Sequence, residues 1–214
     1  MVAEGVFSTG GLNSYCSADE VFKVLLGYDL APFGGQEALA ERVAELLPLT
    51  KAMVETGAGR DFHWHVGETI ALDGSGTDRL QLEAAPPVFV RALRVAGRTI
   101  ASTQYRTYAE TGLVRLQPTG TLARFPEGLG NVEVDLDWGF EQTPGDVRLA
   151  QAKLTAAELL AELGGEGGGV RETRIGDYAV RYAEEGRYAG AVGRLCAEAE
   201  DVVRRYRRVR VGAV

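Results

Sequence analysis

The chain has 214 residues, of which 45% are hydrophobic and 25% charged, and its formal net charge is −7. This length and composition are typical of a globular protein with one compound domain or two small associated domains. No stretch approaches the roughly 18 consecutive apolar residues that cross a bilayer, and no basic region followed by an apolar one begins the chain. We therefore expect an intracellular protein that does not enter a membrane.

Cysteine usage and charge exclude further classes of function. Cys16 and Cys196 lie far apart and are the only two cysteines, so a cysteine-based zinc site is excluded. We interpret them as reduced, partly buried thiols, and a disulfide between the chain ends is the alternative. The negative net charge predicts that the protein as a whole is repelled by nucleic acid. Arginines nevertheless cluster near the C-terminus, at Arg204, Arg205, Arg207, Arg208 and Arg210.

Two helices are predicted first. Ser17 and Glu20 form a capping box, in which each side chain can satisfy a free amide at the helix start, and Gly27 ends this helix. A second helix follows and ends at Gly59. We expect Pro48 to kink or divide it, because proline lacks the amide that its turn needs. Its inner face carries Leu39, Val43, Leu46, Leu47, Thr50 and Val54.

From about residue 60 to residue 140 the pattern changes to short alternating runs separated by turn residues, which predicts antiparallel strands. In the clearest run Val132 and Val134 point one way and Glu133 the other. Pro86-Pro87 marks the start or the edge of a strand, and Gly112 is expected in a hairpin turn with positive φ. The predicted strands are Glu68–Leu72, Arg79–Leu82, Val88–Val95, Tyr105–Thr107, Leu113–Leu116 and Asn131–Trp138.

Helical periodicity then returns. Thr143 is expected to cap a helix whose first position is Pro144. The glycine-rich tract 164–169 interrupts the pattern and is expected to act as a hinge, and an alternating segment, Arg174–Tyr182, follows it. A final helix is predicted from about Tyr188 to Tyr206. The inner stripes are Val147, Ala150, Leu154, Ala157 and Ala161, then Val192, Leu195, Cys196, Ala199, Val202, Val203 and Tyr206.

This order predicts an α+β fold in which the terminal helices pack as a helical bundle with an inserted antiparallel β domain. We expect an N-terminal helical segment over residues 1–59 and the β domain over residues 60–142. The C-terminal helical segment covers residues 143–214 and includes a short extended arm (170–182) and a basic tail.

Candidate catalytic and metal sites are weak. His63 and His65 could share a face of a strand and one metal, but no third ligand is spaced to join them, so we interpret them as the start of a strand. The segment Asp73–Asp78 lacks the spaced carboxylates of a calcium loop and is interpreted as a hairpin turn. No GxSxG element or activated nucleophile is visible. We predict a protein that is not an enzyme, with no catalytic residue, cofactor or metal.

The arginine-rich C-terminus has three interpretations. The arginines could contact nucleic-acid phosphates, although Tyr206 is the only aromatic residue among them. They could be a solvated helix end whose cations complement the helix dipole. They could also bind carboxylates of a partner protein through their planar guanidinium groups.

Short motifs follow one another in a distinctive order: Glu55…Gly59-Arg60-Asp61-Phe62, Leu80-Gln81-Leu82 with Ala85-Pro86-Pro87-Val88, Tyr105-Arg106 with Thr111-Gly112-Leu113-Val114-Arg115-Leu116, Asn131-Val132-Glu133-Val134-Asp135-Leu136 leading to Trp138-Gly139-Phe140, Arg174-Ile175-Gly176-Asp177-Tyr178, and Tyr206-Arg207-Arg208-Val209-Arg210-Val211. In this order they resemble the tailed-phage head-to-tail connector (adaptor) family, from roughly Ser17 to Val211. The strand that leads to a glycine-aromatic pair and a proline-led helix is similar to a junction of that family. Pro48 and the glycine tract depart from its pattern.

The resemblance implies a structural subunit of a ring, commonly a dodecamer, that docks on the portal protein at the virion neck and is made in the host cytoplasm. Such a ring extends the DNA channel and presents a platform for a stopper or tail-completion protein. DNA would pass without sequence-specific binding, and a negatively charged lumen would offer phosphates few cations. In the family the C-terminal segment often reaches the portal. The implied partner contacts are Arg174, Ile175, Asp177, Tyr178, Arg204, Arg205, Tyr206, Arg207, Arg208 and Arg210.

Three alternatives stay open. The protein could be another neck component, such as a stopper or tail-completion subunit, which shares the ring architecture but has different partners. It could be a nucleic-acid-binding module that uses the arginine-rich end. It could also be a small metal-dependent enzyme built on His63 and His65.

Overall fold

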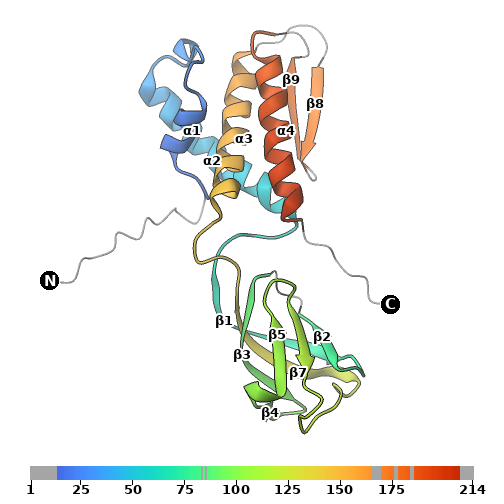
Figure 1. Cartoon of the computed structure of the whole chain (residues 1–214). Helices are drawn as coiled ribbons and strands as arrows, with labels where there is room; N and C mark the ends of the chain where they lie inside the picture. Colours follow the sequence, from blue (N-terminus) through green and yellow to red (C-terminus); the bar gives the residue numbers. More distant parts are fainter. Residues whose placement is uncertain are drawn as a thin grey trace, which may run out of the picture. The chain divides into compact units, whose positions relative to one another are not determined.

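The computed structural model describes residues 14–82, 84, 86–164, 170–175, 178–183 and 186–207. The chain divides into two compact units (Figure 1). The helical unit combines the chain up to Asp61 with the chain from Thr143 onward, and the β unit is Phe62–Gln142. The predicted α+β class is confirmed. No helix within the described ranges is both long and apolar enough to span a membrane.

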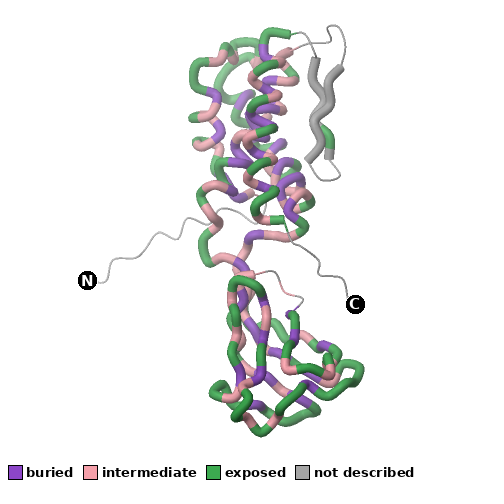
Figure 2. Tube along the Cα trace, turned by 45° about the vertical axis from the view of Figure 1, so that its right-hand side comes forward, coloured by how far each residue is buried: buried purple, intermediate pink, exposed green. Residues whose placement is uncertain are grey.

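The helical unit is built around one central helix, α3. It contacts α1, α2 and α4, and its residues are buried on nearly every side. Figure 2 shows the buried positions along the inner sides of the helices and the exposed positions along their outer sides. The elements of this unit are α1 (Ala18–Val24), a 3-10 turn (Ala31–Phe33), α2 (Gln36–Ala58), α3 (Gly145–Leu163), β8 (Val170–Ile175), β9 (Tyr178–Ala183) and α4 (Ala189–Arg205).

The capping box at the start of α1 is confirmed. The Glu20 amide donates to the Ser17 hydroxyl, and the Ser17 amide donates to the Glu20 carboxylate at 2.9 Å. Pro48 was expected to kink or divide the second helix, and division is wrong, because α2 continues through it. Thr50, two residues later, donates its hydroxyl back to the Leu46 carbonyl at 3.1 Å. Proline removes only one backbone donor, and the packing of α2 on α3 holds the helix together on both sides of it.

The start of α3 differs from the prediction. The helix begins at Gly145, Pro144 is its N-cap residue rather than its first helical residue, and no side chain caps it. The Thr143 cap is therefore wrong. Asp146 lies in the first turn instead, where a carboxylate is favoured by the helix dipole. The last helix is predicted almost to its ends, and its buried residues are Val192, Leu195, Cys196, Ala199 and Val203.

The β unit consists of two antiparallel sheets that share one core. The four-stranded sheet has the order β1-β7-β3-β4 and the three-stranded sheet the order β2-β6-β5. The strands are β1 (His65–Gly74), β2 (Arg79–Gln81), β3 (Val88–Val95), β4 (Arg98–Ile100), β5 (Tyr105–Tyr108), β6 (Leu113–Leu116) and β7 (Gly128–Trp138). Between the sheets lie Leu72, Leu80, Leu82, Val88, Leu93, Val95, Ile100, Tyr105, Val114, Leu116, Phe125, Val132, Val134 and Leu136.

Each predicted strand of this unit is present, and the short strand β4 was not predicted. The turn between β5 and β6 is a hairpin, with Gly112 at φ +65° as expected. The interpretation of Asp73–Asp78 as a hairpin turn is wrong. It joins β1 to β2, but β1 pairs with β7 and β2 pairs with β6, so this segment carries the chain from one sheet to the other.

The two chain ends of the β unit lie side by side. The rings of Phe62 and Phe140 stack with centroids 6.1 Å apart. Gly139 has φ +91°, and a Cβ there would lie 1.9 Å from the His63 carbonyl oxygen. The chain therefore enters and leaves this unit through one tight junction, as an inserted domain requires.

Candidate interaction surfaces

The end of α4 is fixed to the start of α3. The Tyr206 hydroxyl donates to Asp146 Oδ1 at 3.0 Å, and an Arg205 guanidinium nitrogen lies 3.7 Å from Asp146 Oδ2. One turn earlier Val203 is buried in the unit. These contacts hold the last turn of α4 against the helical unit.

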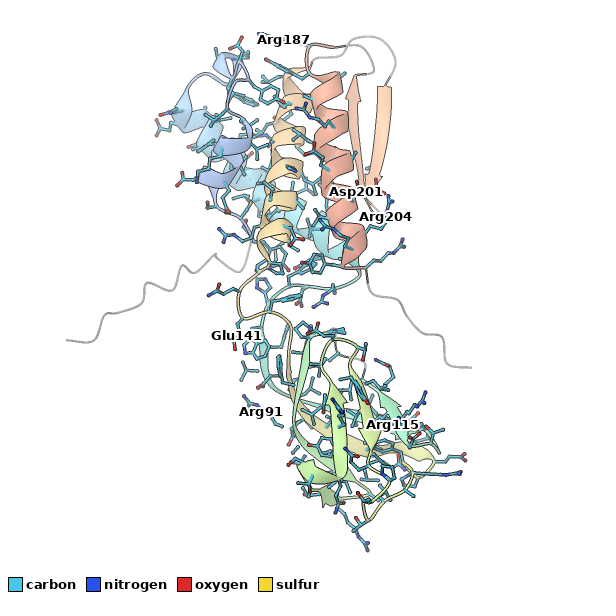
Figure 3. All side chains as sticks on the ribbon, viewed as in Figure 1. Arg91, Arg115, Glu141, Arg187, Asp201 and Arg204 are labelled. Atoms are coloured by element: carbon cyan, nitrogen blue, oxygen red, sulfur yellow. The ribbon has the colours of Figure 1, made fainter. Side chains whose placement is uncertain are left out.

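The arginines of this end are exposed. Arg204 donates to Glu200 at 3.0 Å within α4, and the side chains of Arg204 and Arg205 are 64% and 65% exposed. Arg207 is also exposed. Exposed ion pairs of this kind contribute little stability, so these guanidinium groups can exchange their present partners for those of another protein. Figure 3 labels Asp201 and Arg204 near the end of α4.

The segment expected as a short extended arm is a two-stranded hairpin. β8 and β9 pair antiparallel from Val170↔Ala183 to Ile175↔Tyr178 and pack beside α2, α3 and α4. Because α3, β8, β9 and α4 alternate in direction, β8 ends and β9 begins toward the same end of the unit at which α3 begins and α4 ends (Figure 1).

The expected partner contacts are therefore distributed as follows. Arg174, Ile175 and Tyr178 lie in the hairpin, at that end of the helical unit. Arg204, Arg205, Tyr206 and Arg207 lie at the end of α4, toward the same end. Asp177, Arg208 and Arg210 lie outside the described residues.

No metal or nucleophile site emerges from the described part of the chain. His65 begins β1, as interpreted, and its ring stacks on Trp138 with centroids 3.8 Å apart. Among the described residues no three His, Cys, Asp or Glu side chains gather closely enough to hold a metal ion. Burial raises the pKa of the Cys16 thiol to about 11 and that of Cys196 to about 12, and both are buried free thiols as expected. Neither thiol is activated for nucleophilic attack.

The outer face of the four-stranded sheet carries paired charges. Asp135 of β7 accepts from the Arg94 guanidinium at 2.6 Å and from the Thr69 hydroxyl at 2.8 Å. The hydrogen bond from Arg94 is the main cause of the lowered pKa of Asp135. Asp137 accepts from Arg91 at 2.7 Å. On this face the acids of β7 are therefore paired with arginines of the neighbouring strand β3.

The outer face of the three-stranded sheet is different, and the sequence reasoning missed it. Arg79 of β2, Arg115 of β6 and Arg106 of β5 lie directly opposite one another. We call these three residues the arginine row. The alternating pattern of each strand had signalled an outward-facing arginine, but only the strand order and register bring the three together.

Several large apolar side chains are exposed on both units. Leu26 after α1 is 77% exposed, and Leu129 of β7 is 91% exposed. In the β unit Val66 is 61% and Phe89 50% exposed, and the Phe89 ring packs edge-on against Trp64 with centroids 5.5 Å apart.

No protein-family profile matches the chain, and no curated protein matches it. Among solved structures it is similar to a chain in the neck of an empty GTA particle computed with C6 symmetry, with 20% identity over 92% of this chain and 91% of that chain and a TM-score of 0.49. A chain in the neck of the native GTA particle, computed with C12 symmetry, gives 20% identity, coverages of 94% and 97%, and a TM-score of 0.44. A chain in the virion of the native gene transfer agent (GTA) particle gives 20% identity, coverages of 92% and 91%, and a TM-score of 0.47.

Proposed function

We propose that the chain is a structural neck protein of a tailed phage or related particle: a head-to-tail adaptor that assembles as a ring on the portal protein and extends the DNA channel. The observation that carries the proposal is the junction at the end of the β unit. The family motif of a strand, a glycine-aromatic pair and a proline-led helix corresponds here to β7, Gly139-Phe140, Pro144 and α3. Gly139 and Phe140 hold the two chain ends of an inserted β unit together.

The position of the expected contact residues supports portal docking. The hairpin β8–β9 and the arginines that end α4 lie toward the same end of the helical unit. Asp146 holds the end of α4 at the start of α3 through its contacts with Tyr206 and Arg205. Guanidinium groups presented together suit bidentate pairing with carboxylates of a partner protein.

Exposed apolar side chains support assembly into a ring. Leu26, Val66, Phe89 and Leu129 are each at least half exposed, and assembly into a ring would bury those that lie at contacts between subunits. We assign no catalytic role to the protein, because Asp135 and Asp137 are paired with arginines and its two thiols are buried.

The proposal is tested by mixing the purified protein with a candidate portal protein and imaging the mixture by electron microscopy. We expect rings of this chain stacked on the portal. Replacing the five arginines between Arg204 and Arg210 with glutamine should abolish co-purification with the portal, whereas replacing them with lysine should weaken it less, because charge is kept and only the planar guanidinium is lost.

Three outcomes would contradict the adaptor role. If the chain stayed monomeric and did not bind the portal protein, the adaptor role would be wrong. Binding only to a stopper or tail protein would favour another neck component. Salt-dependent binding of duplex DNA that disappears with the glutamine variant would favour a nucleic-acid-binding module.

A further inference from the structure

The arginine row crosses the three-stranded sheet of the β unit from edge to edge. Arg79 is opposite Arg115, and Arg115 is opposite Arg106. Directly opposite residues of antiparallel strands share a face, with Cβ atoms about 4.5–5.5 Å apart. The Arg79 and Arg115 side chains are 64% and 47% exposed, and Arg106 is exposed as well. Figure 3 labels Arg115 on this sheet.

The row lacks enough acid to balance it. Asp78 accepts from Arg115 Nε at 2.7 Å and lies 3.8 Å from Arg79 Nε, so one carboxylate serves two guanidinium groups. Within the part of the chain that the structure describes, no carboxylate forms an ion pair with Arg106. Three cations and one anion leave a local charge of +2. Like charges directly opposite one another destabilise a sheet, so the stability of the fold does not explain the row.

A shallow hollow adjoins the unbalanced end of the row. Its volume is about 180 Å³, and its lining is Arg106, Tyr108, Arg115, Leu116, Gln117 and Pro118. The Arg106 guanidinium lies 5.4 Å from the centroid of the Tyr108 ring, which is an attractive cation–π arrangement. Two arginines therefore border a recess with an aromatic wall. Its volume suits one or two side chains of another molecule.

We propose that the arginine row and this hollow bind an acidic segment of a protein partner, with one carboxylate held between Arg106 and Arg115. Planar guanidinium groups pair with carboxylates in two-pronged hydrogen bonds. Burial of such a carboxylate would supply the second anion that the row lacks. This inference does not depend on the adaptor role, since it concerns a surface of the β unit for which the adaptor resemblance implies no partner contact.

Nucleic acid is the less favoured occupant because of the charge around the row. Residues 62–142 contain seven arginines and ten acidic residues, so the β unit carries 7 − 10 = −3. A polyanionic duplex would meet this negative field over its whole length. A short acidic segment meets only the recess, where the local charge is positive.

The test measures binding of a fluorescein-labelled hexaglutamate peptide to the full chain by fluorescence anisotropy at low salt. We expect binding that weakens about tenfold or more in Arg106→Gln, because the variant loses hydrogen bonds between charged groups, which are stronger than those between neutral groups. Arg98→Gln is the matched control. It removes one exposed arginine from β4, in the other sheet of the same unit, and should leave the dissociation constant within about twofold.

Thermal melting of the same variants separates binding from folding. Arg106→Gln removes a like-charge pair, so its melting temperature should equal or exceed that of the parent protein. The proposal would be overturned if hexaglutamate did not bind, or if its binding weakened as much in Arg98→Gln as in Arg106→Gln. The proposal would also be overturned if a labelled 20-base-pair DNA duplex bound more tightly than the peptide and Arg106→Gln abolished that binding.

Discussion

At the scale of single residues, the helical unit depends on a buried polar side chain. Gln151 of α3 is fully buried. Its Oε1 accepts from the Tyr15 amide at 2.7 Å and from the Cys16 amide at 3.0 Å, and its Nε2 donates to the Leu47 carbonyl at 2.8 Å. One side chain thus joins the segment before α1, the middle of α2 and the central helix.

Replacing Gln151 with leucine should destabilise the helical unit strongly. The change keeps the volume roughly constant but leaves the Tyr15 and Cys16 amides buried without an acceptor, at about 1–3 kcal/mol each. We expect a loss of roughly 2–5 kcal/mol in the free energy of unfolding, measured by urea denaturation. Gln36→Leu at the exposed start of α2 is the control and should change stability by less than about 0.5 kcal/mol. Equal stability of the two variants would show that water replaces the lost acceptor.

The burial of Gln151 cannot be predicted from the sequence pattern of its helix. Gln151 lies beside the predicted inner stripe of its helix, and a polar residue in that position is predicted to be exposed to solvent. Burial of Gln151 depends on α2 and the segment before α1 packing over it, and neither is visible in the sequence around it. The capping box of Ser17 and Glu20, in contrast, involves only neighbours in the sequence and was predicted correctly.

At the scale of elements, the β7–α3 connection sets how the two units are joined along the chain. The Gly139 amide donates to the Pro87 carbonyl at 3.0 Å, while its Cα lies against the His63 carbonyl. No side chain fits in this position. The glycine is therefore needed for close approach and for its positive φ together.

Gly139→Ala should consequently open the junction. A Cβ 1.9 Å from the His63 oxygen forces the backbone to move, and φ +91° is unfavourable for alanine. We expect a loss of about 2 kcal/mol or more in thermal or urea unfolding. Gly145→Ala is the matched control, because a Cβ there meets nothing within 4 Å and the position begins a helix, so stability should stay level or rise. Comparable losses in both variants would show that the close approach does not matter.

At the scale of the whole molecule, the helical unit is made from both ends of the chain, and the β unit is inserted between them. Closing the helical unit therefore requires residues separated by the full length of the insertion to meet, which has an entropic cost. A β unit that folds first would bring its two ends together at Phe62 and Phe140 and shorten that loop.

This arrangement predicts that damage to one unit stays within it. Val203 of α4 is 3% exposed, and Val203→Asp places a charge in the helical core. We expect faster amide hydrogen exchange in α3 and α4, with exchange in β3 and β7 unchanged, together with a lower melting temperature and loss of ring formation. Ala197→Asp on the exposed side of α4 is the control. Equal acceleration in both units would show that the chain unfolds as one cooperative body.

The sequence determined the elements, because their causes are local. Alternation over 131–138, the hairpin glycine Gly112, the Ser17 capping box and the helical stripe around Val203 each involve residues within a few positions of one another, and each was predicted. The α+β class followed from the order of these elements.

Tertiary structure alone decided which strands pair, which helix lies at the centre and which surface charges meet. The turn at Asp73–Asp78 resembles a hairpin locally, yet its flanking strands join different sheets, since β1 pairs with β7 and β2 pairs with β6. The arginine row has the same origin in part: Arg106 and Arg115 face each other across a local hairpin, but Arg79 joins them only through the pairing of β2 with β6. Local sequence fixes backbone geometry through sterics and hydrogen bonds, whereas long-range contacts depend on the sum of many buried surfaces, which no short pattern contains.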